Sequence, residues 1–287
     1  MKNYLIVVLL IMPLLTSAQQ KHAYKVFNKE GEPVTYFDVL ESASDSDIVF
    51  FGELHNNPVS HWLQIELTKD LYNTKKDKLI LGAEMFESDD QIILDEYLND
   101  IIAEKNFKEE AKLWNNYSTD YRPLVEFAKA NTLKFIATNV PRRYASAINR
   151  GGFDALGNLS DMAYQFLPPL PIPYDPELPA YKAMLEMQGM PGHVNENLPK
   201  AQAIKDAAMA HSILQNYAEN NTFLHFNGAY HSNNFEGIVW YLKQYGKSSG
   251  IMVITTVEQD EVETLDKEHY NSADYIIAVP TSMTKTY

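Results

Sequence analysis

The chain contains no cysteine among its 287 residues. Disulfide bonds therefore cannot stabilise it, and its stability must come from its packed core. A chain of this length is long enough to bury one large core, or one core with a smaller subdomain. Without cysteine, the chain also has no lipobox residue to which a lipid anchor could be attached.

Arginine is scarce: the 24 basic residues include only Arg122, Arg142, Arg143 and Arg150, which lie close together in the sequence. The formal net charge is −14. This acidity argues against binding to nucleic acid or to anionic membrane surfaces, since both attract a basic face. An anionic small ligand responds to local charge instead. The arginine cluster indicates either a carboxylate-binding spot, which suits the planar guanidinium, or ion pairs at the surface.

Long apolar runs are also lacking, apart from residues 4–15. This run is shorter than the roughly 20 residues that a membrane-spanning helix needs. It follows a lysine and precedes Thr16-Ser17-Ala18, a layout typical of a secretory signal peptide. We therefore expect a signal peptide at residues 1–18 and one domain at residues 19–287. The mature protein would be secreted or periplasmic, without a stable membrane anchor.

Polar side chains are concentrated where residues 48–51, IVFF, end at Gly52. The apolar run is typical of a buried strand. Glu53 and His55 follow it, and Pro58 lies where a helix would begin. In open α/β sheets, ligands bind outside the carboxyl ends of the strands. The sequence thus predicts a functional site here.

The same pattern occurs a second time, at residues 221–234, NTFLHFNGAYHSNN, where Gly228 precedes His231 by three residues, as Gly52 precedes His55. A third strand-like segment, LILGAEMFE, supplies Glu84. Each histidine alone fits a hydrogen-bonded core residue equally well. Two copies at matching strand ends favour one site with His55, His231, Glu53 and Glu84 around it.

Strand-like and helical segments alternate along the chain. This alternation predicts an α/β fold with a central, mainly parallel sheet flanked by helices on both faces. Residues 152–199 differ, because they hold eight of the fourteen prolines and cannot form part of a sheet. We expect them to form a helical, Pro-rich insertion that lies as a lid over the carboxyl ends of the strands. The predicted strands are residues 48–51, 78–84, 133–138, 223–226, 249–257 and 274–279.

Six segments carry a family resemblance: in order, FGELH, GAEMFE, WNNYSTDYRPLVEFA, IATNVPRRY, QAIKDAAMA and FNGAYH. Together they resemble the ChaN-like haem-binding uptake proteins, a branch of the Tiki/TraB/erythromycin-esterase superfamily. The resemblance covers roughly residues 34–260. It implies an extracytoplasmic protein of haem or iron uptake, with haem bound between two protomers of a homodimer and a tyrosine as iron ligand.

Three chemistries fit the predicted site. His55, His231 and Glu84 could hold a divalent metal such as Zn, Mn or Co, with Glu53 or Glu84 as general base of a secreted hydrolase, a protease or esterase. A glutamate and a histidine could also act as general acid and base without metal. The third possibility is haem, which needs aromatic walls, cations for its propionates and a His or Tyr for its iron.

The family resemblance favours haem over hydrolysis. It points to Tyr121 as the first candidate iron ligand, because Tyr121 adjoins Arg122, with Tyr117 and Tyr230 as further candidates. We expect Arg142 and Arg143 to contact the propionates. The complete set of expected haem-binding residues is His55, His231, Tyr121, Arg122, Arg142 and Arg143.

Overall fold

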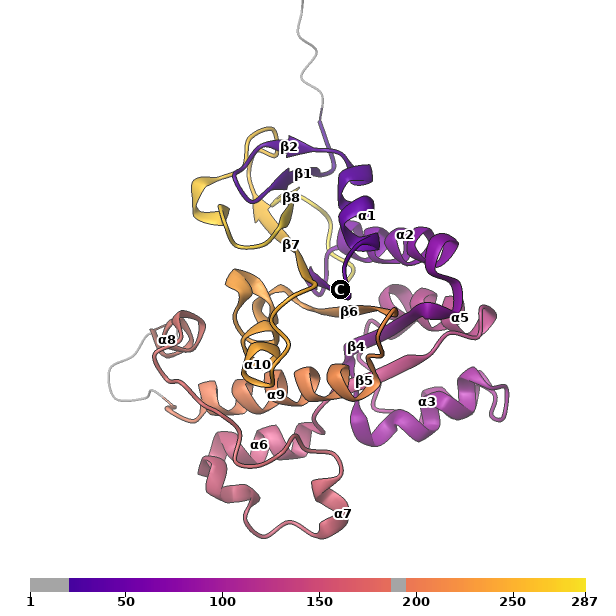
Figure 1. Cartoon of the computed structure of the whole chain (residues 1–287), viewed down its shortest axis with the longest axis vertical. Helices are drawn as coiled ribbons and strands as arrows, with labels where there is room; N and C mark the ends of the chain where they lie inside the picture. Colours follow the sequence, from indigo (N-terminus) through magenta and orange to yellow (C-terminus); the bar gives the residue numbers. More distant parts are fainter. Residues whose placement is uncertain (1–20, 187–194) are drawn as a thin grey trace, which may run out of the picture.

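The computed structural model describes residues 21–186 and 195–287, so the predicted signal peptide lies outside the described residues. Its centre is one eight-stranded sheet with the order β2-β1-β8-β7-β3-β6-β4-β5 (Figure 1). No helix in the described ranges is long and apolar enough to cross a membrane. The strands are β1 Lys25–Asn28, β2 Pro33–Val34, β3 Ile48–Glu53, β4 Leu79–Glu87, β5 Phe135–Asn139, β6 Thr222–Gly228, β7 Ile251–Gln259 and β8 Tyr275–Pro280.

The sheet is mainly parallel, as the sequence predicts. Strands β3 to β8 pair in parallel, and only the short β1 and β2 at one edge, within the part of the chain that the structure describes, pair antiparallel. The predicted strands at residues 48–51 and 78–84 are both present, although β6 lies between them. The carboxyl end of β6 is thereby placed between those of β3 and β4.

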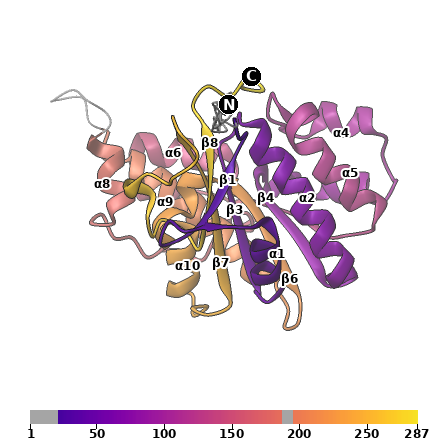
Figure 2. The ribbon, with the colours of Figure 1, turned by 90° about the horizontal axis from the view of Figure 1, so that it is seen from above.

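Helices cover both faces of the sheet, which confirms the predicted α/β architecture (Figure 2). Helices α1 to α5 bury their apolar side chains on one face, and α6 to α10 do so on the other. The helices are α1 Tyr36–Ser44, α2 Pro58–Lys75, α3 Gln91–Leu98, α4 Glu104–Glu110, α5 Arg122–Ala130, α6 Arg142–Gly151, α7 Asp161–Tyr164, α8 Pro179–Glu186, α9 Leu198–Asn216 and α10 Ile238–Gln244.

The turn from β3 to α2 has the geometry expected from its sequence. Asn57 is the N-cap, and its side-chain oxygen accepts hydrogen bonds from Val59 N and Ser60 N. Pro58 occupies the first turn, where its missing N–H costs nothing. This capped start fixes the direction in which the chain leaves the strand, and so holds the polar residues between β3 and α2 at the sheet edge.

The Pro-rich insertion at residues 152–199 is helical in part, through α7 and α8. Its apolar side chains, among them Leu167 and Tyr181, belong to the core layer of α6, α9 and α10 on one face of the sheet. The insertion reaches the strand ends where Tyr230 Oη donates a hydrogen bond to Ala180 O. In its described part, the insertion is therefore a packed subdomain that reaches the strand ends, and its position as a lid over them stays a prediction.

Phe51 in β3 tests how far this core supports the sheet. Its ring is about 1% exposed, and truncation to alanine leaves a cavity in the central strand. We expect Phe51→Ala to lower the free energy of unfolding by about 3–5 kcal/mol in urea denaturation. Phe37→Ala on α1 is the matched control, because Phe37 is 67% exposed and its loss should change stability by less than about 0.5 kcal/mol. Equal effects would contradict this core.

Candidate functional site

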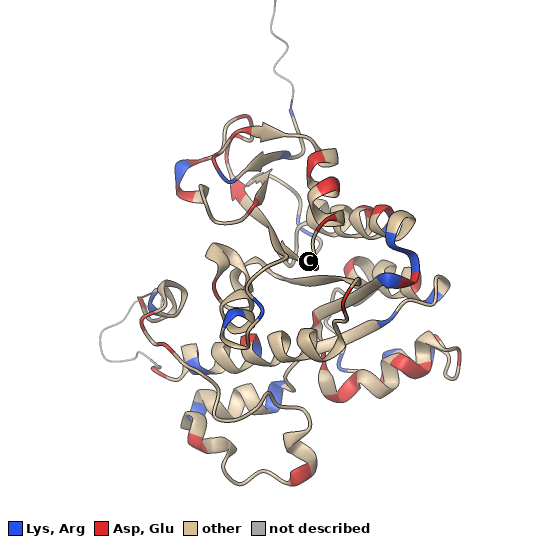
Figure 3. Cartoon of the chain, viewed as in Figure 1, with Lys and Arg blue, Asp and Glu red and all other residues tan. Residues whose placement is uncertain are grey.

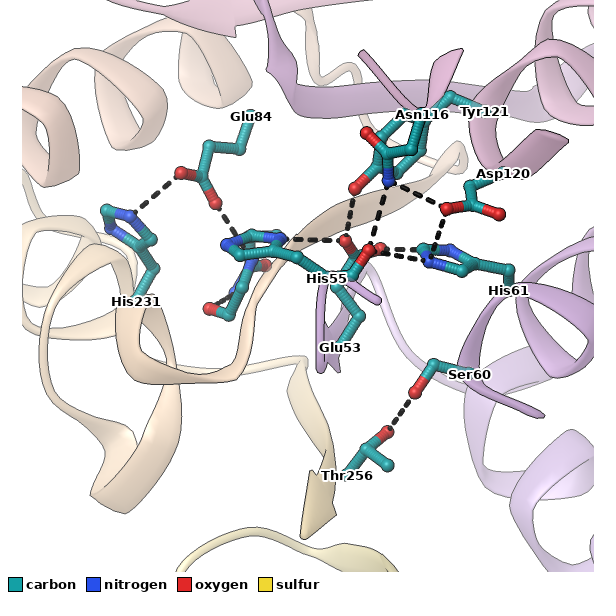
Figure 4. Close-up of polar contacts among 12 residues, drawn as sticks. Glu53, His55, Ser60, His61, Glu84, Asn116, Asp120, Tyr121, His231 and Thr256 are labelled. Carbon is teal, nitrogen blue, oxygen red and sulfur yellow. Dashed lines mark hydrogen bonds and ion pairs between the residues drawn. The ribbon is translucent and has the colours of Figure 1, made fainter. Parts of the chain in front are cut away.

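The carboxylate of Glu53 is buried at the end of β3. Tyr121 Oη donates to Glu53 Oε1 at 2.6 Å, and His55 Nδ1 donates to the same oxygen at 2.9 Å, as Figure 4 shows. Gln64 Nε2 donates to the other oxygen at 2.5 Å. A buried carboxylate is costly unless such partners replace its lost hydration. The partners of Glu53 thus make it a fixed anchor for the His55 imidazole.

His55 is the accessible end of this network. Its side chain is 37% exposed and packs edge-on against Trp114, with ring centroids 4.9 Å apart. Burial lowers the pKa of His55, but the hydrogen bond to Glu53 and the charge of Glu84 outweigh this effect and raise it. His55 can therefore hold a proton near neutral pH and present it to a ligand.

A second buried network joins Glu84 on β4, His231 after β6 and Asp206 on α9. His231 Nε2 lies 3.0 Å from Glu84 Oε1, and its Nδ1 lies 2.5 Å from Asp206 Oδ1. Burial lowers the pKa of His231, but the two carboxylates outweigh it and raise this pKa to about 10. The same pairing holds the pKa of Glu84 well below its usual range. His231 is accordingly an imidazolium between two acidic side chains.

Gly228 explains why the two motifs meet. Its backbone N–H donates to Glu84 Oε2 at 2.8 Å. A Cβ at this position would lie 2.7 Å from Cε1 and Nε2 of His55. The imidazole from the first Gly-x-x-His motif therefore occupies the space left by the glycine of the second. The structure thus brings Glu53, His55, Glu84 and His231 together, as the sequence predicts.

These four residues line a cavity of about 870 Å³ at the carboxyl ends of the strands. This volume is in the range of small-molecule and cofactor sites. Arg142, at the start of α6, also lines the cavity, together with Lys205 on α9. Figure 3 shows basic positions on both of these helices. A neighbouring cavity of about 690 Å³ shares Arg142 and contains Arg143. Basic side chains therefore lie at both cavities, beside the glutamates of the strand ends.

The structure does not bring Tyr121 and Arg122 to either cavity. Tyr121 is buried beneath Glu53, and burial together with the Glu53 charge raises its pKa far above the ordinary range, so its phenol stays protonated. Arg122 forms two hydrogen bonds with Glu104, at 2.7 and 3.2 Å, on the outside of the molecule. Tyr117, the next candidate, is also buried. Of the candidate tyrosines, Tyr230 lines the main cavity.

The expected metal site of His55, His231 and Glu84 stays a prediction, and the contacts of His231 bear on it. Both ring nitrogens of His231 are engaged by carboxylates, so neither has a free lone pair to offer a metal. In the described residues, the group whose ligand atoms lie within 4.8 Å of one another is instead Asp266, Glu268 and His269. The arrangement at the strand ends suits proton transfer and anion binding better than metal coordination.

Several residues of the site escape sequence reasoning. Asp206 and Lys205 lie inside a long Ala-rich helix, where no local pattern marks them as functional. His269 lies in a polar segment that reads as exposed, yet it lines the main cavity, and its Nε2 is buried without a hydrogen-bond partner. Trp114 also lines the cavity. Lys205, Asp206 and Trp114 lie in segments that carry the family resemblance, but only tertiary packing shows that they reach the site.

A third cavity, of about 530 Å³, lies beside the edge strand β5, between α3 and α9. Gln91 occupies part of the strand edge there, since its amide donates to Phe135 O at 3.0 Å and accepts from Ala137 N at 2.6 Å. None of the predicted site residues lines this cavity. The predicted glutamates and histidines of the site lie instead at the carboxyl ends of the strands, around the main cavity.

The fold and the site define an α/β protein with a cavity at the carboxyl ends of the strands of a mainly parallel sheet. Residues 39–242 match the model of a family described as haem-binding uptake, Tiki superfamily, ChaN. This match covers more than half of the chain, and the protein belongs to that family. A search of curated protein sequences finds no match.

Solved structures share the fold. ChaN of Campylobacter jejuni with cofacial haem is similar over 88% of this chain and 96% of its own, with 18% identity and a TM-score of 0.68. A succinoglycan biosynthesis protein has 11% identity over 87% and 92% of the two chains, with a TM-score of 0.52. A mutant of the erythromycin esterase EreC in its open conformation has 11% identity over 93% and 99%, with a TM-score of 0.50.

The charge of His231 predicts a pH dependence of stability. Its pKa is about 10 in the folded protein and about 6.5 when unfolded, so its contribution is complete below pH 6.5 and is lost as the pH rises through 10. We expect the free energy of unfolding to fall between pH 7 and 10, by at most about 1.4 kcal/mol per pH unit from this group. Urea denaturation at each pH measures it.

The His231→Gln variant lacks the titrating imidazole. Its free energy of unfolding should therefore fall less steeply between pH 7 and 10 than that of the unmodified protein. His22→Gln is the control, because His22 is exposed beside Glu263 and should leave the slope unchanged. Equal slopes for the unmodified protein and His231→Gln would show that His231 is not the buried cation described above.

Proposed function

We propose that this protein binds haem in the main cavity and serves haem or iron uptake outside the cytoplasm. The observation that carries the proposal is the pair of cations at the cavity. Arg142 and Lys205 line it, and in the described ranges the side chain of neither forms a hydrogen bond or ion pair with another residue. Unpaired cations facing one cavity of an acidic protein favour a ligand with carboxylates, such as the haem propionates.

The walls of the cavity also suit a flat apolar ligand. Trp114 and Tyr230 line it with half-exposed rings, and His55 adds a third ring edge-on to Trp114. Aromatic rings offer large apolar surfaces and stack on other ring systems. Haem combines these requirements with two carboxylates, and this combination fits the cavity better than a small hydrophilic substrate would.

Two side chains at the cavity carry atoms that bind haem iron, a tyrosine oxygen and an imidazole nitrogen. Tyr230 Oη donates to Ala180 O, and burial raises the pKa of Tyr230 to about 12. His269 Nε2 is buried and has no hydrogen-bond partner. The proposal assigns Tyr230 as the first candidate iron ligand, in agreement with the tyrosine implied by the family resemblance, and His269 as the second.

Secretion and dimer formation complete the proposal. The apolar run at residues 4–15 followed by Thr16-Ser17-Ala18 supports export. The haem contacts expected from the sequence remain His55, His231, Arg142 and Arg143. The structure-based proposal adds Lys205. Haem between two protomers would bring two cavities together, and the molar mass in solution with and without hemin measures whether it does.

The cations can be tested by substitution. Arg142→Ala and Lys205→Ala should each weaken hemin binding about tenfold, the loss expected for one charge-assisted hydrogen bond of about 1.5 kcal/mol. Titration followed at the Soret band measures the affinity. Arg150→Ala is the control, because Arg150 lies at the far end of α6, where it bonds Ser146. If all three variants bind hemin as the unmodified protein does, the cavity cations do not hold the propionates.

The iron ligand has its own test. Tyr230→Phe keeps the ring and removes the oxygen, so it should shift the Soret maximum of the hemin complex while leaving the protein folded. Tyr164→Phe serves as control, because Tyr164 lies on α7, away from the cavity. An unchanged spectrum for Tyr230→Phe, together with a shifted one for His269→Ala, would transfer the role to the histidine.

A further inference from the structure

The segment after β8, residues 281–287, runs back across the carboxyl ends of the strands. Figure 2 shows it leaving β8 on the side of the molecule toward which the parallel strands run. Its first anchor is at Thr281, whose Oγ1 donates to Asp260 Oδ1 at 2.6 Å. Lys285 forms an ion pair with Glu258, which lines the main cavity. The segment therefore stays close to the strand ends along its length.

Thr286 holds the end of this segment against the site. Its backbone N–H donates to Asn56 O at 2.9 Å, in the loop that carries His55. Its hydroxyl donates to Asp120 Oδ2 at 2.8 Å. Asp120 is about 4% exposed, so this hydrogen bond is shielded from water and holds the segment more firmly than a surface contact would.

Asp120 connects Thr286 to the ligand-facing imidazole. Asn116 Nδ2 donates to Asp120 Oδ2 at 2.7 Å and also lies 3.0 Å from His55 O (Figure 4). His61 Nε2 lies 3.0 Å from the same backbone oxygen. Asn116, which fixes the backbone of His55, thus also bonds the Asp120 carboxylate that holds Thr286, so the segment is connected to the site.

Tyr287 lies where the two neighbouring cavities meet. It lines both the cavity of about 870 Å³ and the cavity of about 690 Å³, as do Trp114 and Arg142. Its side chain is 64% exposed, so the core does not hold its ring. An aromatic ring held by a backbone anchor but left exposed at a cavity boundary has surface available for a ligand.

We propose that residues 281–287 form a strap over the ligand cavity, in which the Thr286–Asp120 hydrogen bond is the latch and the Tyr287 ring contacts the bound ligand. This inference rests on haem binding in the main cavity and adds a residue to it. The strap slows the escape of the ligand, because the ring must move aside before a flat porphyrin can leave past Trp114. Tyr287 is therefore a positioning residue for the ligand.

The rate of hemin release tests the strap. After loading with hemin, excess apomyoglobin captures what dissociates, and the Soret change gives the dissociation rate constant. We expect Tyr287→Ala to release hemin about tenfold faster and Thr286→Val, which keeps the shape but loses the hydroxyl, several-fold faster. Thr74→Val is the matched control, because the Thr74 hydroxyl donates to Leu71 O within α2, away from the strap and the cavity. Unchanged release from Tyr287→Ala would overturn the strap.

A second measurement separates the strap from haem binding itself. With Trp62 and Trp240 replaced by Phe, Trp114 is the remaining tryptophan of the three and reports access to the cavity. We expect acrylamide to quench it more efficiently in Tyr287→Ala and Thr286→Val than in the control variant Thr74→Val. If the unmodified protein fails to bind hemin, the proposed ligand is wrong, and equal quenching in all variants overturns the strap independently of that result.

Discussion

The cost of burying Glu53 on β3 and Glu84 on β4, two parallel strands that lie on either side of β6, determines much of this structure. A buried carboxylate persists as a charge only where cations and hydrogen-bond donors replace water. Each glutamate here has a histidine from one of the two Gly-x-x-His motifs. The site depends on this compensation, because it fixes the loops after β3 and β6 and leaves the His55 imidazole facing the cavity.

The sequence predicts this central pairing and the fold around it. Alternating strands and helices indicate the mainly parallel sheet, and polar residues after three buried strands indicate where the site lies. The geometry of Gly228 gives the motif a physical reason, since any side chain there would collide with His55. Local patterns suffice to predict the site, because the carboxyl ends of parallel strands lie on the same side of the sheet and bring their polar residues together.

Long-range packing decides the remaining parts of the site, and the sequence predicts them poorly. Tyr121 reads as an accessible loop tyrosine, yet it is buried as a hydrogen-bond donor to Glu53. Asp206 and Lys205 lie in the family segment QAIKDAAMA, but that helical pattern does not show that Asp206 completes the pairing of His231. The composition of the Pro-rich insertion does not reveal that its described side chains join the core layer of α9. Register and tertiary contacts determine each of these positions.

The location of bound iron tests the central claim most directly. Crystals of the hemin complex, measured on both sides of the iron absorption edge, would give the iron position independently of any assumption about the ligand. The account predicts an iron peak in the cavity between Trp114 and Tyr230, with the porphyrin carboxylates toward Arg142 and Lys205. An iron peak at the β5 edge cavity, or at Asp266, Glu268 and His269 without porphyrin, would contradict it.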